Sequence, residues 1–165
     1  MPYDCGMDTT YAAAQLITDV SLAMLRDAIA GLPDEAVQWK PLPEASSMNV
    51  LVVHSITSAR FFLGCGAGKK TSRRHYLEAD RVAAFESRGA TTAQLLQAID
   101  EAAVEFRHLL GHAPATALAE VIAWPEEYPD ERFTGAECLF RAIGHLREHV
   151  GHAQLMHDLW LAAHP

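Results

Sequence analysis

Four stretches of the chain repeat apolar residues every three or four positions, the spacing of a helix that buries one face. We predict these helices over about residues 8–31, 48–64, 91–111 and 134–163. A residue able to cap the first turn begins or precedes each one: Asp8 or Thr9, Ser46 or Ser47, Thr91 or Thr92, and Thr134. Glu137 follows Thr134 by three positions, as in a capping box. The pattern predicts an all-α, four-helix bundle in which residues 1–165 form a single domain.

The segments between these helices carry weaker signals. Residues 34–49 contain two X-Pro steps and a serine pair, which predict a connecting loop. Residues 66–90 are mixed, and we expect short helix and loop there, with helix over Glu78–Glu86. Residues 112–133 look irregular, and we predict no sheet because no run alternates well between turn signals. In the first helix, the apolar repeat consists of Leu16, Val20, Ala23, Met24 and Ile29.

Composition narrows the classes of protein that fit. Apolar residues make up 50% and charged residues 21%, the balance of an ordinary globular chain. The net charge of −8 argues against nucleic acid as a partner, and the basic cluster of residues 69–74 reads as a solvated loop rather than an anion site. Three cysteines without CxxC spacing predict neither disulfides nor a zinc knuckle. With no signal peptide or membrane span expected, a reduced, cytoplasmic setting follows.

The last predicted helix carries most of the candidate chemistry. His145, His149 and His152 form one stripe on the shoulder of its buried face, whereas His157 points away. Neutral imidazole is the commonest metal ligand, and two histidines four positions apart can share one ion. His145 and His149 have that spacing, and His149 with His152 is the competing pair. An HxxxH pattern alone is weak evidence, because it also arises by chance.

His54 is the candidate third ligand. It lies on the apolar side of the second predicted helix, where a lone histidine is more often a hydrogen-bonded core residue than a ligand. A buried imidazole nevertheless needs a partner for each ring nitrogen. A metal ion shared with two histidines of another helix would meet that need. From the residues alone, metal ligation by His54 and a purely structural role for His54 are equally well supported.

The chain resembles the DinB-like superfamily of small four-helix bundles, which includes thiol-dependent enzymes such as mycothiol-dependent maleylpyruvate isomerase. Three features carry the resemblance: His54 in an apolar second helix after the Trp39–Pro43 loop, the histidine pair followed by Val-Gly-His, and the DRVAAFESRG segment at residues 80–89. The resemblance implies one divalent metal held by His54, His145 and His149, and a homodimer. In mycothiol-type relatives the position of His145 is often Glu, so the chain looks closer to a three-histidine branch.

Three neutral histidines leave an ion its full charge and free coordination positions, which is typical of a catalytic site. We therefore expect a metal-dependent enzyme of thiol S-transferase or hydrolase type, with zinc, nickel or iron and a low-molecular-weight thiol as cofactors and a small molecule as substrate. Glu148 and His152 are the candidate acid–base residues, although a surface ion pair for Glu148 is the simpler interpretation. The alternative is a non-catalytic metal-binding or stress-response module. No residue indicates action on DNA.

Overall fold

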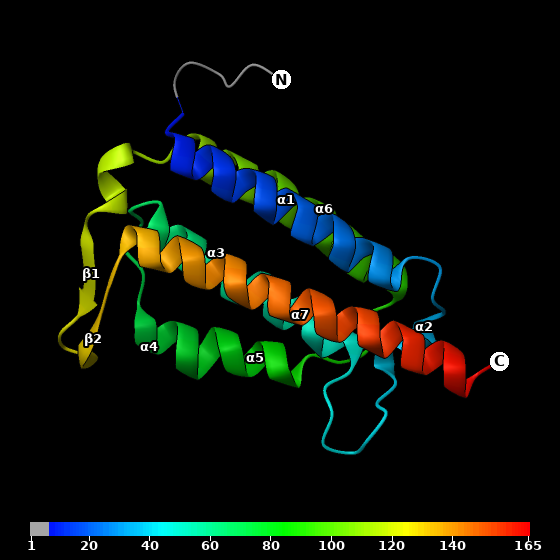
Figure 1. Cartoon of the computed structure of the whole chain (residues 1–165). Helices are drawn as coiled ribbons and strands as arrows, with labels where there is room; N and C mark the ends of the chain where they lie inside the picture. The colour runs from blue at the N-terminus through cyan, green and yellow to red at the C-terminus, as the bar shows by residue number, and fades with distance from the viewer. Residues whose placement is uncertain (1–6) are drawn as a thin grey trace.

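The computed structural model describes residues 7–165, so Cys5 lies outside it. Helices make up most of the described chain, with one small hairpin at one end (Figure 1). The elements are α1 Thr9–Ile29, α2 Asp34–Gln38, α3 Met48–Gly66, α4 Arg73–His75, a π-helical turn Tyr76–Asp80, α5 Arg81–Glu86, α6 Thr92–Gly111, a 3₁₀ turn Ala115–Leu118, β1 Val121–Trp124, β2 Tyr128–Thr134 and α7 Gly135–Ala163.

The four long helices are those predicted, and local capping explains where they start. The Asp8 side chain accepts a hydrogen bond from the Thr10 amide at 2.8 Å, and Ser47 accepts one from the amide of Val50. Complete capping boxes precede α6 and α7, from Thr91 with Gln94 and from Thr134 with Glu137. The all-α bundle is therefore confirmed, and its helix starts follow from residues close in sequence.

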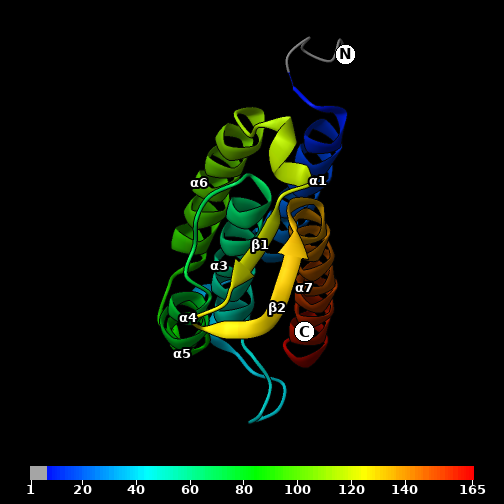
Figure 2. The ribbon, with the colours of Figure 1, turned by 90° about the vertical axis from the view of Figure 1, so that its left-hand side faces the viewer.

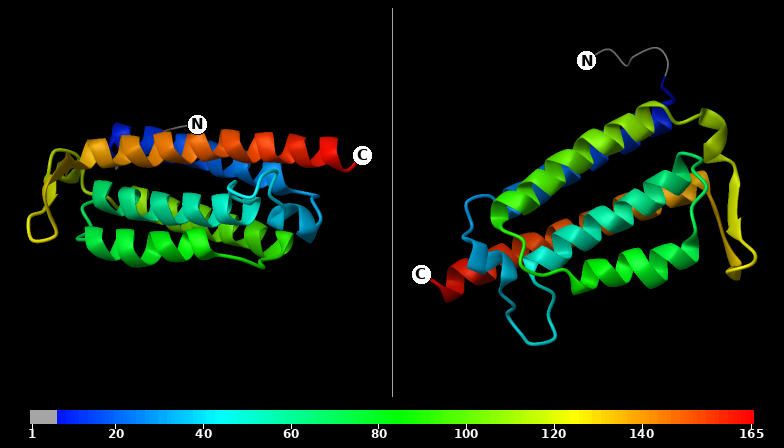
Figure 3. Two further views of the ribbon diagram at one scale, coloured as in Figure 1. Left: turned by 90° about the horizontal axis from the view of Figure 1, so that it is seen from below. Right: turned by 180° about the vertical axis from the view of Figure 1, so that it is seen from behind.

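Helix α3 forms the centre of the bundle. It packs against α7 on one side and lies between α6 and the α4–α5 segment on the other (Figure 3). Its sequence is long and apolar enough to span a membrane, but 83% of that window is buried inside the protein, as expected for a core helix. Gly66 lets α7 approach closely, because a Cβ atom there would lie 2.5 Å from Leu139 Cδ2. The α3–α7 contact fixes the relative position of two helices that carry histidines.

The predicted absence of a sheet is wrong. Strands β1 and β2 pair antiparallel in the register Val121↔Thr134 and Ile122↔Phe133, and they lie over one end of the bundle (Figure 2). The hairpin is anchored by Trp124, whose Nε1 donates a hydrogen bond to the Thr71 carbonyl at 2.8 Å. This is a contact between distant segments, so alternation within residues 112–133 could not reveal it.

Two other sequence interpretations need correction. Leu16 and Val20 of α1 are 63% and 47% exposed, because a different side of α1 faces the bundle, the one that carries Tyr11, Leu22 and Leu25. Helix also extends further than predicted between the second and third long helices. It runs without a break from Arg73 to Glu86 through the π turn, and the predicted 34–49 loop contains the short helix α2.

Candidate metal centre

His54, His145 and His149 come together where α3 packs against α7. His54 is 4% exposed, whereas His145 and His149 are half-buried and stand one turn apart on α7. The apolar stripe of α7 that was predicted from the sequence faces the core and turns the histidine stripe toward α3. Its members are Leu139, Leu146, Val150 and Ala153. The packing of two amphipathic helices thus brings residues 91 positions apart into contact.

The three imidazoles meet through their Nε2 atoms. His145 Nε2 lies 3.2 Å from His54 Nε2 and 3.2 Å from His149 Nε2. A neutral imidazole nitrogen either carries one proton or offers one lone pair. His145 Nε2 can therefore complete only one of these two contacts as a hydrogen bond. Hydrogen bonding among the three neutral rings therefore leaves one of the two Nε2–Nε2 contacts without a hydrogen bond.

A metal ion fits this arrangement. Histidine nitrogens bind zinc at about 2.0–2.1 Å, so two ligands of a tetrahedral ion lie about 3.4 Å apart. The observed separations of 3.2 Å are close to that value. All three residues offer ligand atoms within 4.8 Å of one another. The group can therefore hold a divalent ion.

Burial keeps these histidines neutral, the form that ligates metals. Burial foremost, and the neighbouring rings to a smaller extent, lower the pKa of His54 to about 3 and that of His149 to about 4. Burial also lowers the pKa of His145, against an opposing effect of Glu148. Protons therefore compete little with a metal ion near neutral pH.

Helix α5 supplies two neighbours that sequence reasoning did not place at the site. The Phe85 ring lies 4.3 Å from the His54 ring, centre to centre. The Arg81 guanidinium carbon lies 4.8 Å from the Phe85 ring centre, and its charge lowers the pKa of both His54 and His145. Both residues belong to the DRVAAFESRG segment, which was noted only as part of the family resemblance.

The remaining candidates lie at the edge of the group. His152 is exposed, with its Nδ1 3.4 Å from His149 Nδ1, so His145 rather than His152 meets His54. Glu148 is also exposed, and its charge acts on His145 and His149. His157 points elsewhere and contacts Asp158 at 3.1 Å.

The other ring nitrogens of the group are less well supported. The Nδ1 atoms of His54 and His145 are buried, and neither has a hydrogen-bond partner in the described part of the chain. Histidine ligands usually donate this second N–H to a carboxylate, carbonyl or water, which fixes the ring orientation. Here the rings are oriented by packing, foremost that of Phe85 on His54.

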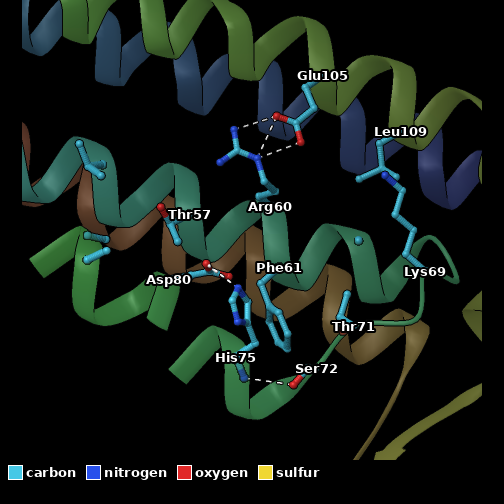
Figure 4. A pocket seen from close by; sticks show the side chains of 14 residues that line it. Thr57, Arg60, Phe61, Lys69, Thr71, Ser72, His75, Asp80, Glu105 and Leu109 are labelled. Carbon is cyan, nitrogen blue, oxygen red and sulfur yellow. Dashed lines mark hydrogen bonds and ion pairs between the residues drawn. The ribbon is translucent and has the colours of Figure 1, made fainter. Parts of the chain in front are cut away.

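A separate cavity of about 600 Å³ lies between α3, α6 and the α4–α5 segment (Figure 4). Its rim includes two ion pairs, Arg60 with Glu105 at 2.8 Å and His75 with Asp80 at 3.3 Å. The volume is within the range of small-molecule sites. None of the three clustered histidines lines this cavity, so it is not the space over the candidate centre.

Cys138, two turns before His145 on α7, is fully buried beside Cys65. A hydrogen bond with Cys65, followed by burial, raises the pKa of the Cys138 thiol. This thiol stays protonated and serves as a small core residue. Its environment is not that of a reactive cysteine.

Comparison with known proteins identifies the family. A search of curated proteins finds no match to the chain. The profile of the DinB superfamily matches residues 17–153, which include α3, α5, α6, most of α7 and all three clustered histidines. The match covers well over half of the sequence, so the chain belongs to the DinB superfamily.

Proposed function

We propose that this protein binds one divalent metal ion through His54, His145 and His149, and that it is a metal-dependent enzyme of the thiol S-transferase or hydrolase type. The observation that carries the proposal is the pair of 3.2 Å contacts made by His145 Nε2. Hydrogen bonding can satisfy one of them, whereas one ion satisfies all three nitrogens. Zinc, nickel and iron all accept three imidazoles.

The ligand set supports catalysis rather than a closed structural site. Three neutral ligands leave a positive charge and at least one open position. An ion bound there supplies Lewis-acid chemistry, which lowers the pKa of a water or thiol at the open position. Glu148 is exposed beside His145 and His149, where it can accept the released proton. His152 contacts His149 and orients that ring.

The second candidate is a metal-binding module without turnover, used for stress response or interaction. Two observations favour it. Phe85 covers His54, and the 600 Å³ cavity is not lined by the three histidines. A module of this kind would bind metal and gain stability but would process neither thiols nor esters.

We also propose a cytoplasmic homodimer. The outward face of α7 exposes Phe140 and Leu155 at 69% and 58% of their surface. Gly144 and Gly151 lie on the same face, and within residues 7–165 a Cβ at either position would meet open space beyond the helix's own backbone. Glycine in a helix interior costs about 1 kcal/mol relative to alanine. Close approach of a second α7 would offset that cost.

Metal content of untagged protein tests the proposed centre. Elemental mass spectrometry should find one equivalent of metal in the native chain and less than about a tenth of an equivalent in His54→Ala, because removing one of three ligands greatly weakens metal binding. His108→Ala is the matched control, since it removes an exposed histidine from α6. Equal metal content in native protein and His54→Ala, or none after incubation with zinc, nickel and iron, would reject the proposal.

Enzyme activity is tested separately from metal binding. Metal-loaded protein should accelerate either thiol transfer to an electrophilic acceptor or hydrolysis of activated esters, and Glu148→Gln should slow that reaction at unchanged metal content. Full metal occupancy with neither activity would reject the enzyme and favour the non-catalytic module.

A further inference from the structure

Arg81 is a cation at the candidate centre without an acidic partner. Across residues 7–165, no carboxylate lies within ion-pair distance of its guanidinium. Four other arginines of the bundle, Arg26, Arg60, Arg73 and Arg107, each pair with a carboxylate at 3.1 Å or less. Arg81 instead rests on the face of Phe85. That stacking leaves the in-plane N–H groups of the guanidinium free to bind a planar anion.

The distance from Arg81 to the histidines is limited by two contacts. The guanidinium carbon lies 4.8 Å from the Phe85 ring centre, which lies 4.3 Å from the His54 ring centre. Added end to end, these contacts set an upper limit of about 9 Å between the Arg81 charge and the His54 ring. A ligand would start from the ion, about 2.0–2.1 Å from His54 Nε2, and not from the ring centre. An ion–sulfur bond of about 2.3 Å, a two-methylene spacer of about 4 Å and an arginine–carboxylate pair span a distance of the same order.

Charged residues of opposite sign act on the three histidines from different helices, so an anionic ligand group has one favoured direction. Arg81 on α5 acts electrostatically on His54 and His145. Glu148 on α7 acts on His145 and His149 with the opposite sign. An anionic ligand group is attracted toward α5 and repelled from the Glu148 side.

We propose that Arg81 is a specificity-determining residue that selects ligands with a metal-binding thiol and a carboxylate two or three carbons away. This inference rests on the proposed metal centre and names the chemical class of its ligand. The thiol loses its proton to solvent and occupies the open position of the ion, while the carboxylate pairs with the Arg81 guanidinium. A neutral thiol of the same length makes only the first contact.

Cobalt(II) substitution gives a readout that does not require activity, because thiolate binding to cobalt produces a strong charge-transfer absorption. Chelator-treated protein is loaded with one equivalent of cobalt and titrated at pH 7 with 3-mercaptopropionate and, separately, with 3-mercapto-1-propanol. The native protein should bind the acid at least about tenfold more tightly, the range of a charge-assisted hydrogen bond. Arg81→Gln should reduce that preference to less than about threefold.

Arg74→Gln is the matched control. It removes the same charge from an exposed arginine of the same continuous helix, at the end away from Phe85. This variant should keep the native preference for the acid. Circular dichroism should show all three proteins equally helical, because both arginines are exposed.

The outcomes separate this inference from the proposed function. A cobalt-loaded native protein that binds both thiols equally, or an Arg81→Gln variant that keeps the preference, overturns the role of Arg81 and leaves the metal centre standing. Equal loss in Arg81→Gln and Arg74→Gln shows a general charge effect and also overturns it. A chain that takes up no cobalt overturns both proposals.

Discussion

Acidifying the metal-free protein from pH 7 to pH 5 is expected to lower its free energy of unfolding by about 2 kcal/mol through His54 alone. Burial lowers the pKa of His54 to about 3 in the folded protein, against an ordinary value of 6.5. Below pH 6.5 the unfolded chain takes up a proton that the folded protein does not. The stability is therefore fully present above pH 6.5 and is lost as the pH falls toward 3.

The size of the effect follows from proton uptake by the unfolded chain. Each pH unit below 6.5 shifts the balance by up to about 1.4 kcal/mol per histidine. Between pH 7 and pH 5 the sum is about 2 kcal/mol for any folded-state pKa below 5. The prediction thus depends on His54 staying neutral when folded, and its 4% exposure supports that.

Urea unfolding at both pH values measures the effect on chelator-treated protein. His54→Gln keeps a polar side chain but cannot be protonated, so its stability should change about 2 kcal/mol less between pH 7 and pH 5 than that of the native chain. His149, with a folded-state pKa of about 4, contributes in both proteins. His108→Gln, on the surface of α6, should retain the native pH dependence. Identical pH dependence in the native protein and His54→Gln would refute the argument.

Three further predictions follow from individual contacts. Phe85→Ala should weaken zinc binding about tenfold in a chelator competition, because packing orients His54; unchanged affinity would show that the ring is held by other means. Trp124→Phe removes the hydrogen bond to the Thr71 carbonyl and should cost about 1–2 kcal/mol in urea unfolding; a loss below about 0.3 kcal/mol would mean that the hairpin does not depend on this bond. Leu155→Glu should convert the proposed dimer to monomer in analytical ultracentrifugation, whereas a native chain that is already monomeric would contradict the dimer.

Short-range signals explain why the long helices could be predicted. The caps at Asp8, Ser47, Thr91 and Thr134 act over two or three residues, so the sequence contains the information directly. The four-residue spacing of His145 and His149 is also local. Their meeting with His54 is not, and its prediction required the family resemblance, because helical periodicity alone does not say which helices are neighbours.

The contribution of α5 was missed for a physical reason. The π turn at Tyr76–Asp80 precedes it and changes the residues per turn, so a regular helical wheel drawn across residues 78–86 assigns the wrong faces. Phe85 and Arg81 are four residues apart and share one face of α5, but nothing within this segment says that the face lies against His54 of α3. In α1 two apolar series compete: Tyr11, Leu22 and Leu25 face the bundle, whereas the series of Leu16 and Val20 faces outward.

The free-energy cost of burying the three histidines helps to decide between metal binding and a purely structural role. The folded chain keeps three neutral imidazoles close together and, without an ion, leaves one Nε2 contact of His145 unsatisfied. Two buried Nδ1 atoms also lack partners among residues 7–165. Each buried, unsatisfied polar group costs about 1–3 kcal/mol. An apolar residue at position 54 would avoid most of that cost in a helix that is otherwise almost wholly buried. A ligand that binds only the folded state offsets it, because binding adds its free energy to stability. The group is therefore costly as core packing and favourable as a metal site.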